Sequence, residues 1–285
     1  MPDATPPASA PRHRRRRLLC GALALLGASA ALQAGAGGRI VSINLCTDQL
    51  LLLLAPRSRI ASVSHLAANP LYSAYADRAD GLPVNHARIE EIVAQDPSLI
   101  LAYQYSDGQL VRLLRQLGYR VEVIPAPDTL EDVAAAIATA ARVLDEAHAG
   151  ARIVAQMQQH LQSMAGSAPR RRPLAVIYAP DGYSPGAASL SGAILAAAGF
   201  RNLSAELGNA HGANLPLEQL LRAQPDLIII DDDEADKHSL AQRKLTHPAL
   251  RQGLPAATTV RLSGRYWSCP TPKVVDAVAD LRAYR

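Results

Sequence analysis

The stretch IEEIVAQDPSLIL (residues 89–101) has the pattern of an amphipathic helix, a proline-containing turn and an apolar strand. The chain repeats this arrangement 128 positions later as LEQLLRAQPDLII (residues 217–229), with Glu218 in the place of Glu90. In each copy a glutamate lies in the first helical turn and apolar residues line one face of the helix. The repeat therefore indicates that the chain has two similar halves.

Both halves alternate short apolar runs with helical segments. Runs rich in Val, Ile and Leu are typical of buried strands, and strands that alternate with helices are typical of a parallel sheet flanked by helices. The predicted strands of the first half are RIVSIN (39–44), RIASVSH (59–65), LILAY (99–103) and RVEVIPA (120–126). Those of the second half are PLAVIYA (173–179), DLIIID (226–231) and TTVRLS (258–263). We therefore predict an α/β fold with two Rossmann-like lobes, each built on a parallel sheet.

The segment between the two halves differs in composition. Residues 129–165 are rich in Ala and other helix formers, with apolar residues at helical spacing and only Gly150 as an interruption. They predict one long helix, or two nearly collinear helices, joining an N-terminal lobe (37–128) to a C-terminal lobe (170–285). Ligands of parallel α/β lobes lie outside the carboxyl ends of the strands, so we expect the loops of the two lobes to face each other across a ligand cleft.

The N-terminal residues have the pattern of an export signal. RHRRRR (12–17) is followed by an apolar run, LLCGALALLGASAALQA, and then by small residues suited to cleavage. The pattern predicts a signal peptide over residues 1–36, which uses either the general secretory route or, because Arg15 and Arg16 are adjacent, the twin-arginine route. An uncleaved anchor is the alternative, although the apolar run is just short of the ~20 residues that a membrane span needs.

The positive charge of the chain comes mainly from this leader. The full sequence has 29 Lys and Arg against 25 Asp and Glu, a formal net charge of +4. Removing residues 1–36 takes away five Arg and one Asp, which leaves 24 basic and 24 acidic residues. A nearly neutral chain gives no reason to expect a basic patch for phosphate backbones, so we expect no nucleic-acid partner. An apolar share of 49% is typical of a globular chain and excludes a disordered one.

Two cysteines remain once the leader and its Cys20 are removed. Cys46 and Cys269 are an even pair in a chain that is predicted to be exported to an oxidising compartment. A disulfide between them would tie the two lobes together and obstruct ligand exchange. As free thiols they could contact a soft metal or a metal chelate. As a third alternative, they are small residues that pack separately near the rim of the cleft.

Four stretches of the chain resemble one known family. They are RIVSINLCTDQLLLLLAPRSRIASVS, ARIEEIVAQDPSLILA, PLEQLLRAQPDLIII and RYWSCPTPKVVDAVADL. In order and spacing they are similar to the periplasmic substrate-binding proteins of iron-siderophore, haem and vitamin B12 importers of the ABC type, the class built on a helical backbone. The resemblance covers essentially the whole chain after the leader. It implies a periplasmic, monomeric protein that is not an enzyme, has no intrinsic cofactor and holds a metal chelate between its lobes.

The two repeated glutamates have two interpretations. A carboxylate in the first turn of a helix is stabilised by the helix dipole by about 0.3–1 kcal/mol, and this effect alone can explain a single glutamate. Two matched copies, one in each lobe, suit a symmetric partner. In the family that the chain resembles, one glutamate on each lobe docks into arginine pockets of a dimeric permease that works with its ATPase. The resemblance therefore assigns permease docking to Glu90 and Glu218.

Candidate ligand-binding residues follow the predicted strands. The only Trp, Trp267, lies in a polar stretch and is a good candidate because aromatic rings supply contact area. Arg265 could pair with an anionic chelate or close a local turn. His65, His86 and His211 could ligate iron, but no His-x-x-x-His spacing defines a metal site. The candidates are Asn44, Cys46, Thr47, His65, Tyr103, Tyr105, Tyr183, His211, Arg265, Tyr266, Trp267 and Cys269, with Asn214 beside them.

The sequence therefore predicts a binding protein that captures a metal chelate and delivers it to a membrane permease. A ferric siderophore is the first candidate, followed by haem and then a corrinoid, because LPVNH (82–86) lacks the tryptophans that line the cleft of the B12-binding protein. A sensor or scaffold on the same fold is an alternative that the presence of both glutamates disfavours. An exported metal-dependent hydrolase would rest on IDDDEAD (230–236), but no nucleophile–base pair or metal-ligand spacing supports it.

Overall fold

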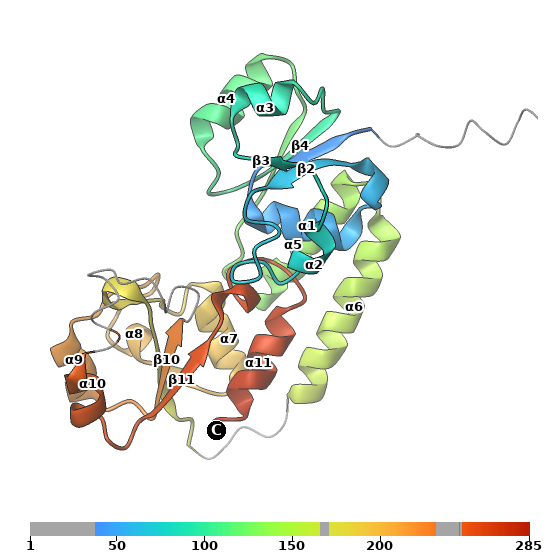
Figure 1. Ribbon diagram of the computed structural model, residues 1–285. Helices are drawn as coiled ribbons and strands as arrows, with labels where there is room; N and C mark the ends of the chain where they lie inside the picture. Colours follow the sequence, from blue (N-terminus) through green and yellow to red (C-terminus); the bar gives the residue numbers. More distant parts are fainter. Residues whose placement is uncertain (1–37, 166–170, 232–244, 246) are drawn as a thin grey trace, which may run out of the picture. The chain divides into compact units, whose positions relative to one another are not determined.

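Two parallel sheets flanked by helices make up the described part of the chain (Figure 1). The computed structural model describes residues 38–165, 171–231, 245 and 247–285. The predicted signal peptide and most of the acidic run at 230–236 lie outside these residues. Within the described part, no helix combines the length and the apolar character that a membrane span requires.

The first sheet has five parallel strands in the order β3-β2-β1-β4-β5. Its strands are β1 (Ile40–Ser42), β2 (Ile60–Ser64), β3 (Val84–Asn85), β4 (Leu99–Tyr103) and β5 (Val121–Ile124). Every residue of β1, β2 and β4 is buried, as expected for a parallel sheet covered on both faces. The helices of this lobe are α1 (Leu45–Leu54), η1 (Arg57–Arg59), α2 (Ala76–Ala79), α3 (Ile89–Val93) and α4 (Gly108–Gln116).

The second sheet has four parallel strands in the order β11-β10-β6-β8. Its strands are β6 (Leu174–Tyr178), β8 (Arg201–Asn202), β10 (Leu227–Asp231) and β11 (Thr258–Leu262). An antiparallel pair is formed by β7 (Tyr183–Ser184) and β9 (Ala213–Asn214). The helices are η2 (Pro180–Gly182), α7 (Leu190–Ala198), α8 (Leu203–Glu206), α9 (Leu217–Ala223), α10 (Pro248–Gly253), η4 (Gly264–Tyr266) and α11 (Val274–Arg282). The predicted α/β fold with two sheet-bearing lobes is therefore confirmed.

The sequence repeat is also a structural repeat. In the first copy α3 leads into β4, and in the second α9 leads into β10. The residue before the proline has a left-handed backbone in both turns, with φ of 44° at Asp96 and 46° at Gln224. The same backbone turn therefore ends both helices and starts both strands.

The helical segment between the lobes differs from the prediction of one long or two collinear helices. It forms two helices, α5 (Leu130–Val143) and α6 (Ala147–Met164). The chain turns between them at Asp145, which has a φ of 62°. A Cβ atom on Gly150 of α6 would lie 2.3 Å from the Cβ of Ala141 in α5, so the two helices pack side by side. The long helix of the prediction is therefore α6 alone, which also contacts α11 (Figure 1).

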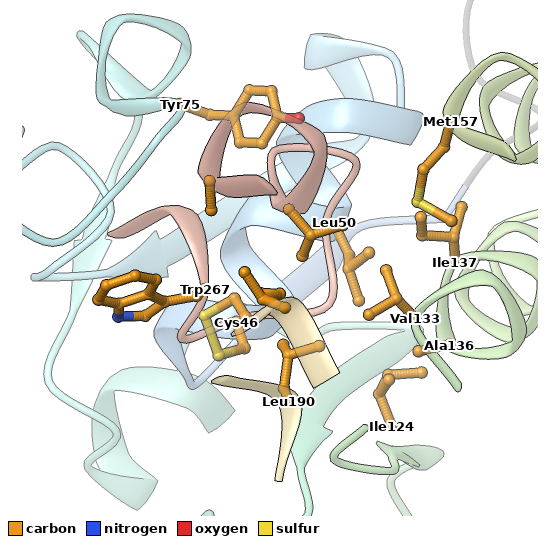
Figure 2. Close-up of a cluster of buried hydrophobic side chains, with 14 of the residues drawn as sticks. Cys46, Leu50, Tyr75, Ile124, Val133, Ala136, Ile137, Met157, Leu190 and Trp267 are labelled. Carbon is orange, nitrogen blue, oxygen red and sulfur yellow. A yellow bond between two sulfur atoms is a disulfide. The ribbon is translucent and has the colours of Figure 1, made fainter. Parts of the chain in front are cut away.

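One hydrophobic core extends through both lobes. It contains buried residues of α1, α5 and α6 together with residues of α7 and α11. Figure 2 shows part of it, including Leu50 and Ile137 from the first half of the chain and Leu190 and Trp267 from the second. Two smaller clusters, one for each sheet, complete the interior. The lobes are therefore joined by a shared core as well as by the connecting helix.

Candidate functional site

A small pocket lies at the carboxyl edge of the first sheet. It measures about 130 Å³ and is lined by residues 43–45, 64–66 and 86–87. These segments directly follow β1, β2 and β3, which are neighbours in the sheet. The carboxyl ends of adjacent parallel strands meet at one edge, and this edge is where α/β lobes bind ligands. We refer to it below as the strand-end pocket.

Asn44 lies on the β1 side of the strand-end pocket and starts α1. Its backbone is extended, and its side-chain oxygen accepts a hydrogen bond from the backbone N–H of Cys46 at 2.9 Å. This is the usual role of an asparagine at a helix N-cap. The predicted ligand contact therefore competes with a capping role, although Asn44 does line the pocket.

Two histidines meet at the rim of the pocket. The rings of His65 and His86 stack with their centroids 5.2 Å apart and an interplanar angle of 18°. Both residues are exposed. Imidazole nitrogens ligate metals well, and the flat rings also suit stacking on a planar ligand. The pair is the most distinctive chemical feature of this edge.

Glu91 holds His86 in place. Its Oε1 lies 3.4 Å from Nδ1 of His86, and its Oε2 accepts the backbone N–H of His86 at 2.6 Å. This backbone hydrogen bond is the main reason that the pKa of the Glu91 carboxyl lies below its usual range. A carboxylate on one ring nitrogen orients the imidazole and leaves the other nitrogen for a ligand. Among the residues that the structure describes, no group of three or more His, Cys, Asp or Glu could hold a metal ion by itself.

The two tyrosines after β4 have different roles. Tyr103 is buried at the end of the strand, and its burial raises the pKa of its hydroxyl. Tyr105 is 74% exposed and contacts Tyr103 edge to face at 5.7 Å. Because β4 is the neighbour of β1, Tyr105 extends the row of accessible polar and aromatic side chains past Asn44. Of the two predicted tyrosines, only Tyr105 is placed to meet a ligand directly.

Two further candidates are buried rather than accessible. Thr47 is fully buried and donates to the backbone oxygen of Asn44 at 3.0 Å, so it shapes the start of α1 from below. Trp267 is only 4% exposed, and its indole packs in the shared core (Figure 2). The prediction that Trp267 offers its ring to the ligand does not agree with this conformation, because the ring is packed among apolar side chains of the core.

The two cysteines form a disulfide. Cys46 of α1 is bonded to Cys269, which precedes α11, across 223 positions of sequence. Both residues are buried. This answers the question that the sequence left open, and it excludes a role for either residue as a free thiol ligand. The bond also ties the start of the first lobe to the end of the second (Figure 2).

The second lobe gathers three of its candidates on the β7–β9 pair. Tyr183 of β7 lies opposite Asn214 of β9. The hydroxyl of Tyr183 donates to the backbone oxygen of His211 at 3.4 Å, and the Asn214 amide donates to Asp181 at 3.2 Å. Tyr183, His211 and Asn214 are all exposed. They form a polar group that is separate from the strand-end pocket.

Arg265 makes local contacts. Its guanidinium donates to the backbone oxygen of Pro70 at 2.7 Å and to the hydroxyl of Tyr266 at 2.8 Å. It also lies 4.7 Å from the centroid of the Tyr266 ring, within range for a cation–π contact. Of the two predicted roles, the structure shows Arg265 in the one that closes a local turn, and it adds a bond to the first lobe.

The two repeated glutamates lie exposed in the first turns of matching helices. Glu90 is in α3 and Glu218 is in α9. Neither helix has a side chain that caps its N-terminus, since Arg88 and Pro216 occupy the cap positions without a side-chain hydrogen bond. Both carboxylates are therefore available to a partner at equivalent places in the two lobes.

A larger hollow, of about 370 Å³, lies over α7, β8 and α8 of the second lobe. Alanines and Phe200 line much of it, and its charged pair, Arg201 and Glu206, is already joined at 2.9 Å. None of the predicted site residues lines it. The strand-end pocket is smaller but holds the convergent polar side chains that a specific ligand site needs.

Comparison with known proteins identifies the family. The family described as periplasmic binding protein matches residues 40–262. The chain belongs to this family. Family members are substrate-binding proteins of ABC importers rather than enzymes, which confirms the predicted class of protein and agrees with a periplasmic location.

Similar proteins of this family carry several ligands. A cobalamin-binding protein of Halobacterium salinarum (strain ATCC 29341 / DSM 671 / R1) is 24% identical over 250 residues, which cover 85% of this chain and 68% of that one. The solved structure of the periplasmic haem-binding protein RhuT from Roseiflexus sp. RS-1 has a TM-score of 0.74 at 21% identity and covers 87% of this chain and 97% of its own. The vitamin B12 binding protein BtuF of Vibrio cholerae has a TM-score of 0.66 at 19% identity and covers 87% and 96%. At these identities the structures show a shared fold, and the ligand is a separate question.

His86 and Ser64 line the pocket and Glu91 contacts His86, and the predicted set of ligand-binding residues contains none of the three, although His86 is among the histidines that could ligate iron. His86 follows β3, a strand of two residues that is too short for a period-two pattern to reveal. Ser64 lies inside the predicted strand at residues 59–65, so the rule that site residues follow strands does not select it. The one available signal was that His65 and His86 each follow an apolar segment of the first lobe.

Proposed function

We propose that this periplasmic binding protein captures a tetrapyrrole-type metal chelate, haem or a corrinoid, at the carboxyl edge of its first sheet. The observation that carries the proposal is the stacked pair His65 and His86 at the rim of the strand-end pocket. Haem leaves axial positions on its iron for an imidazole, and a corrinoid whose axial positions are filled still offers a broad ring for the histidines to contact, whereas a hexadentate siderophore fills the coordination sphere of its iron. The pair therefore changes the order predicted from the sequence, in which a ferric siderophore came first.

The row of accessible side chains supports a flat ligand. His86, His65, Asn44 and Tyr105 follow β3, β2, β1 and β4, which are consecutive in the sheet. A ligand lying along this edge would meet imidazole rings at one end and a phenol ring at the other. The exposed group at Tyr183, His211 and Asn214 is the proposed contribution of the second lobe.

Delivery to a permease is the second part of the proposal. Glu90 and Glu218 occupy equivalent places in the two lobes and are exposed. Carboxylate–arginine pairs are geometrically specific and weaken with salt, which suits docking that must reverse. We propose that the protein works as a monomer that docks on a dimeric permease, after export through the signal peptide at residues 1–36. The lobe boundaries at 37–128 and 170–285 belong to the same proposal.

The test is calorimetric titration of the purified chain with haemin, cyanocobalamin and ferrichrome, supported by the metal content of the protein as isolated. The proposal expects binding of haemin or of cyanocobalamin and weaker or no binding of ferrichrome. Tight binding of ferrichrome alone would return the siderophore to first place. Binding of none of the three would contradict a chelate ligand of these classes.

A further inference from the structure

A layer of buried polar side chains lies directly beneath the strand-end pocket. Its members come from β1, α1, β2 and β3, and each is no more than 5% exposed. They are Ser42, Thr47, Asp48, Ser62, Ser64 and Asn85. Buried polar groups are retained where they are hydrogen-bonded, and a fully bonded network fixes the geometry of whatever it supports. The layer therefore helps to fix the positions of the backbone segments that line the pocket.

Each pocket segment is held from below by a member of this layer. Thr47 holds the 43–45 segment through the backbone oxygen of Asn44. Asn85 donates to the backbone oxygens of Ser42 and Val63 at 2.9 and 3.1 Å, and its own oxygen accepts the backbone N–H of Ala87 at 3.1 Å. Asn85 therefore positions the segment that carries His86.

Asp48 holds the remaining segment, which carries His65. Its Oδ1 accepts the backbone N–H of Ser64 at 3.0 Å, and its Oδ2 accepts the hydroxyl of Ser64. Asp48 is fully buried in α1, whereas Ser64 lines the pocket. Asp48 is also the one member of the layer with an ionisable side chain. A change in the protonation state of Asp48 can therefore alter the pocket through one intervening residue, Ser64.

We propose that Asp48 is a pH-responsive positioning residue, which decides through Ser64 whether the strand-end pocket presents a hydrogen-bond acceptor or a hydrogen-bond donor. When Asp48 is ionised it can only accept, so the Ser64 hydroxyl must donate to it and turns its lone pairs to the pocket. When Asp48 is protonated it donates to the Ser64 oxygen, and the hydroxyl hydrogen of Ser64 becomes free to point into the pocket. Protonation also removes a negative charge from behind the site.

The surroundings of Asp48 place this change in a useful pH range. Burial is the largest influence and raises the pKa of Asp48 to about 6, against the lowering effect of hydrogen bonds from Ser42 and Ser64. Among the described residues, no charged side chain on the elements packed against α1 contributes to the pKa of Asp48. The titratable groups at the pocket itself are His65 and His86, with Glu91 behind His86. Any test must separate Asp48 from these two histidines.

The expected effect depends on the chemistry of the ligand, and this part rests on the proposed function. A ligand with carboxylates, such as haemin, gains a donor and loses a repulsive charge when Asp48 is protonated. The contribution of Asp48 to its affinity is therefore expected to rise as the pH falls through the pKa of Asp48. Cyanocobalamin carries amides and a single phosphodiester anion in place of carboxylates, so this contribution is expected to be smaller for it.

The first experiment needs no ligand. NMR spectra are recorded for the full chain with both pocket histidines replaced, as His65→Gln/His86→Gln. They follow the backbone amide signals of residues 64 and 65 and the carboxyl carbon of Asp48 between about pH 4.5 and 7.5. The expected result is a common midpoint near 6 that disappears in Asp48→Asn and persists in Asp280→Asn, a matched change of a second carboxyl whose pKa is also raised. Amide signals that titrate equally in Asp48→Asn would overturn the proposal. If Asp48→Asn does not fold, a carboxyl carbon that titrates in the ordinary aspartate range would overturn it as well.

The second experiment measures haemin affinity at pH 5 and pH 7 for the wild type and for Ser64→Ala. Both proteins contain His65 and His86, so the histidines affect the two pH dependences alike. Relative to its affinity at pH 7, the wild type is expected to bind haemin at pH 5 roughly five- to tenfold more tightly than Ser64→Ala does, a coupling of ordinary size. An equal pH dependence in the two proteins would overturn the role of Ser64. Failure to bind haemin at any pH would count against the proposed ligand, while the NMR titration would still decide the role of Asp48.

Discussion

His65 and His86 show how the fold creates a site from residues with no sequence pattern. Each histidine follows a strand, and β2 and β3 are neighbours, so the two rings stack. Glu91 then restrains His86 through its ring and its backbone. The order of strands in the sheet brings His65 to His86, and the short connection from β3 into α3 brings Glu91 to His86. The imidazole and carboxylate groups of these residues can bind a ligand, and the edge of the sheet sets the distance between the two rings.

Asp48 is expected to make the stability of the protein depend on pH. Its pKa in the folded state, about 6, lies above the 3.8 of an exposed aspartate, so the folded protein holds this proton more tightly than the unfolded chain does. The free energy of unfolding should therefore fall as the pH rises from about 4 to about 6, by about 3 kcal/mol from this group. Asp48→Asn should lack this part of the slope, whereas Asp280→Asn should keep it.

Chemical denaturation at a series of pH values measures this slope. The wild type and Asp48→Asn share the contributions of all other carboxyls, so the difference between their slopes isolates Asp48. Asp280→Asn shows what removing a second carboxyl with a raised pKa does. Equal slopes for Asp48→Asn and the wild type would show that Asp48 titrates normally in the folded protein.

Single residues also show where prediction from sequence ends. The strand ends could be located, because apolar runs of the right length mark buried strands, and Asn44, His65 and Tyr105 do lie just after strands. The direction in which each side chain points could not be predicted. Thr47 and Trp267 belong to the same predicted set, yet both are buried, because the start of α1 and the shared core turn them inward.

At the level of elements, the connection between the lobes depends on one glycine. α5 and α6 pack side by side, and Gly150 lies against Ala141 at the contact. The composition of residues 129–165 favours helix throughout, so no propensity signal marks the turn at Asp145. The sequence could predict that the segment is helical, but the turn brings α6 back against α5, a contact between helices that a local pattern does not contain.

Gly150→Ala tests this packing. The added Cβ would lie 2.3 Å from the Cβ of Ala141, so the helices would have to move apart. We expect the free energy of unfolding to fall by about 1–3 kcal/mol, despite the better helix propensity of alanine. Gly108→Ala in α4 is a matched control, because its Cβ would meet only the end of the Arg112 side chain at 3.5 Å. Urea denaturation compares the two, and a Gly150→Ala variant as stable as Gly108→Ala would contradict the side-by-side arrangement.

For the whole molecule, the disulfide and the shared core hold the two lobes together. The Cys46–Cys269 bond closes a loop of 223 positions next to Trp267 and α11. The two lobes are therefore covalently tied at this point. The sequence correctly raised the disulfide as one alternative, but the choice needed the folded chain, because only the joining of α1 to α11 brings the two sulfurs into contact.

Removing the disulfide should lower stability without removing the fold. In the chain-entropy treatment a loop of this length is worth roughly 5 kcal/mol, and measured effects are typically about 2–4 kcal/mol. We expect Cys46→Ser/Cys269→Ser to lose about this much free energy of unfolding, and the wild type treated with a thiol reductant to behave like it. An unchanged denaturation midpoint in both would mean that the bond does not form in the protein.

The matched glutamates predict how the molecule meets its transporter. Glu90→Ala/Glu218→Ala should leave chelate affinity unchanged and abolish uptake by cells, because both residues are exposed and lie outside the strand-end pocket. Glu131→Ala is a matched control, since Glu131 is also an exposed glutamate in the first turn of a helix, α5. Normal uptake with the double variant, measured with a labelled chelate, would remove the docking role.

We propose that the paired imidazoles of His65 and His86, at the carboxyl edge of the first sheet, receive the metal chelate. The most direct test of this proposal is the dissociation constant of the chelate that binds the wild type, haemin or cyanocobalamin, measured for His65→Ala/His86→Ala and for His160→Ala, an exposed histidine of α6. We expect a loss of affinity of about 10- to 100-fold for the double variant, the size expected when support of a metal centre is removed, and no change for His160→Ala. Equal affinities for the double variant and the wild type would contradict it.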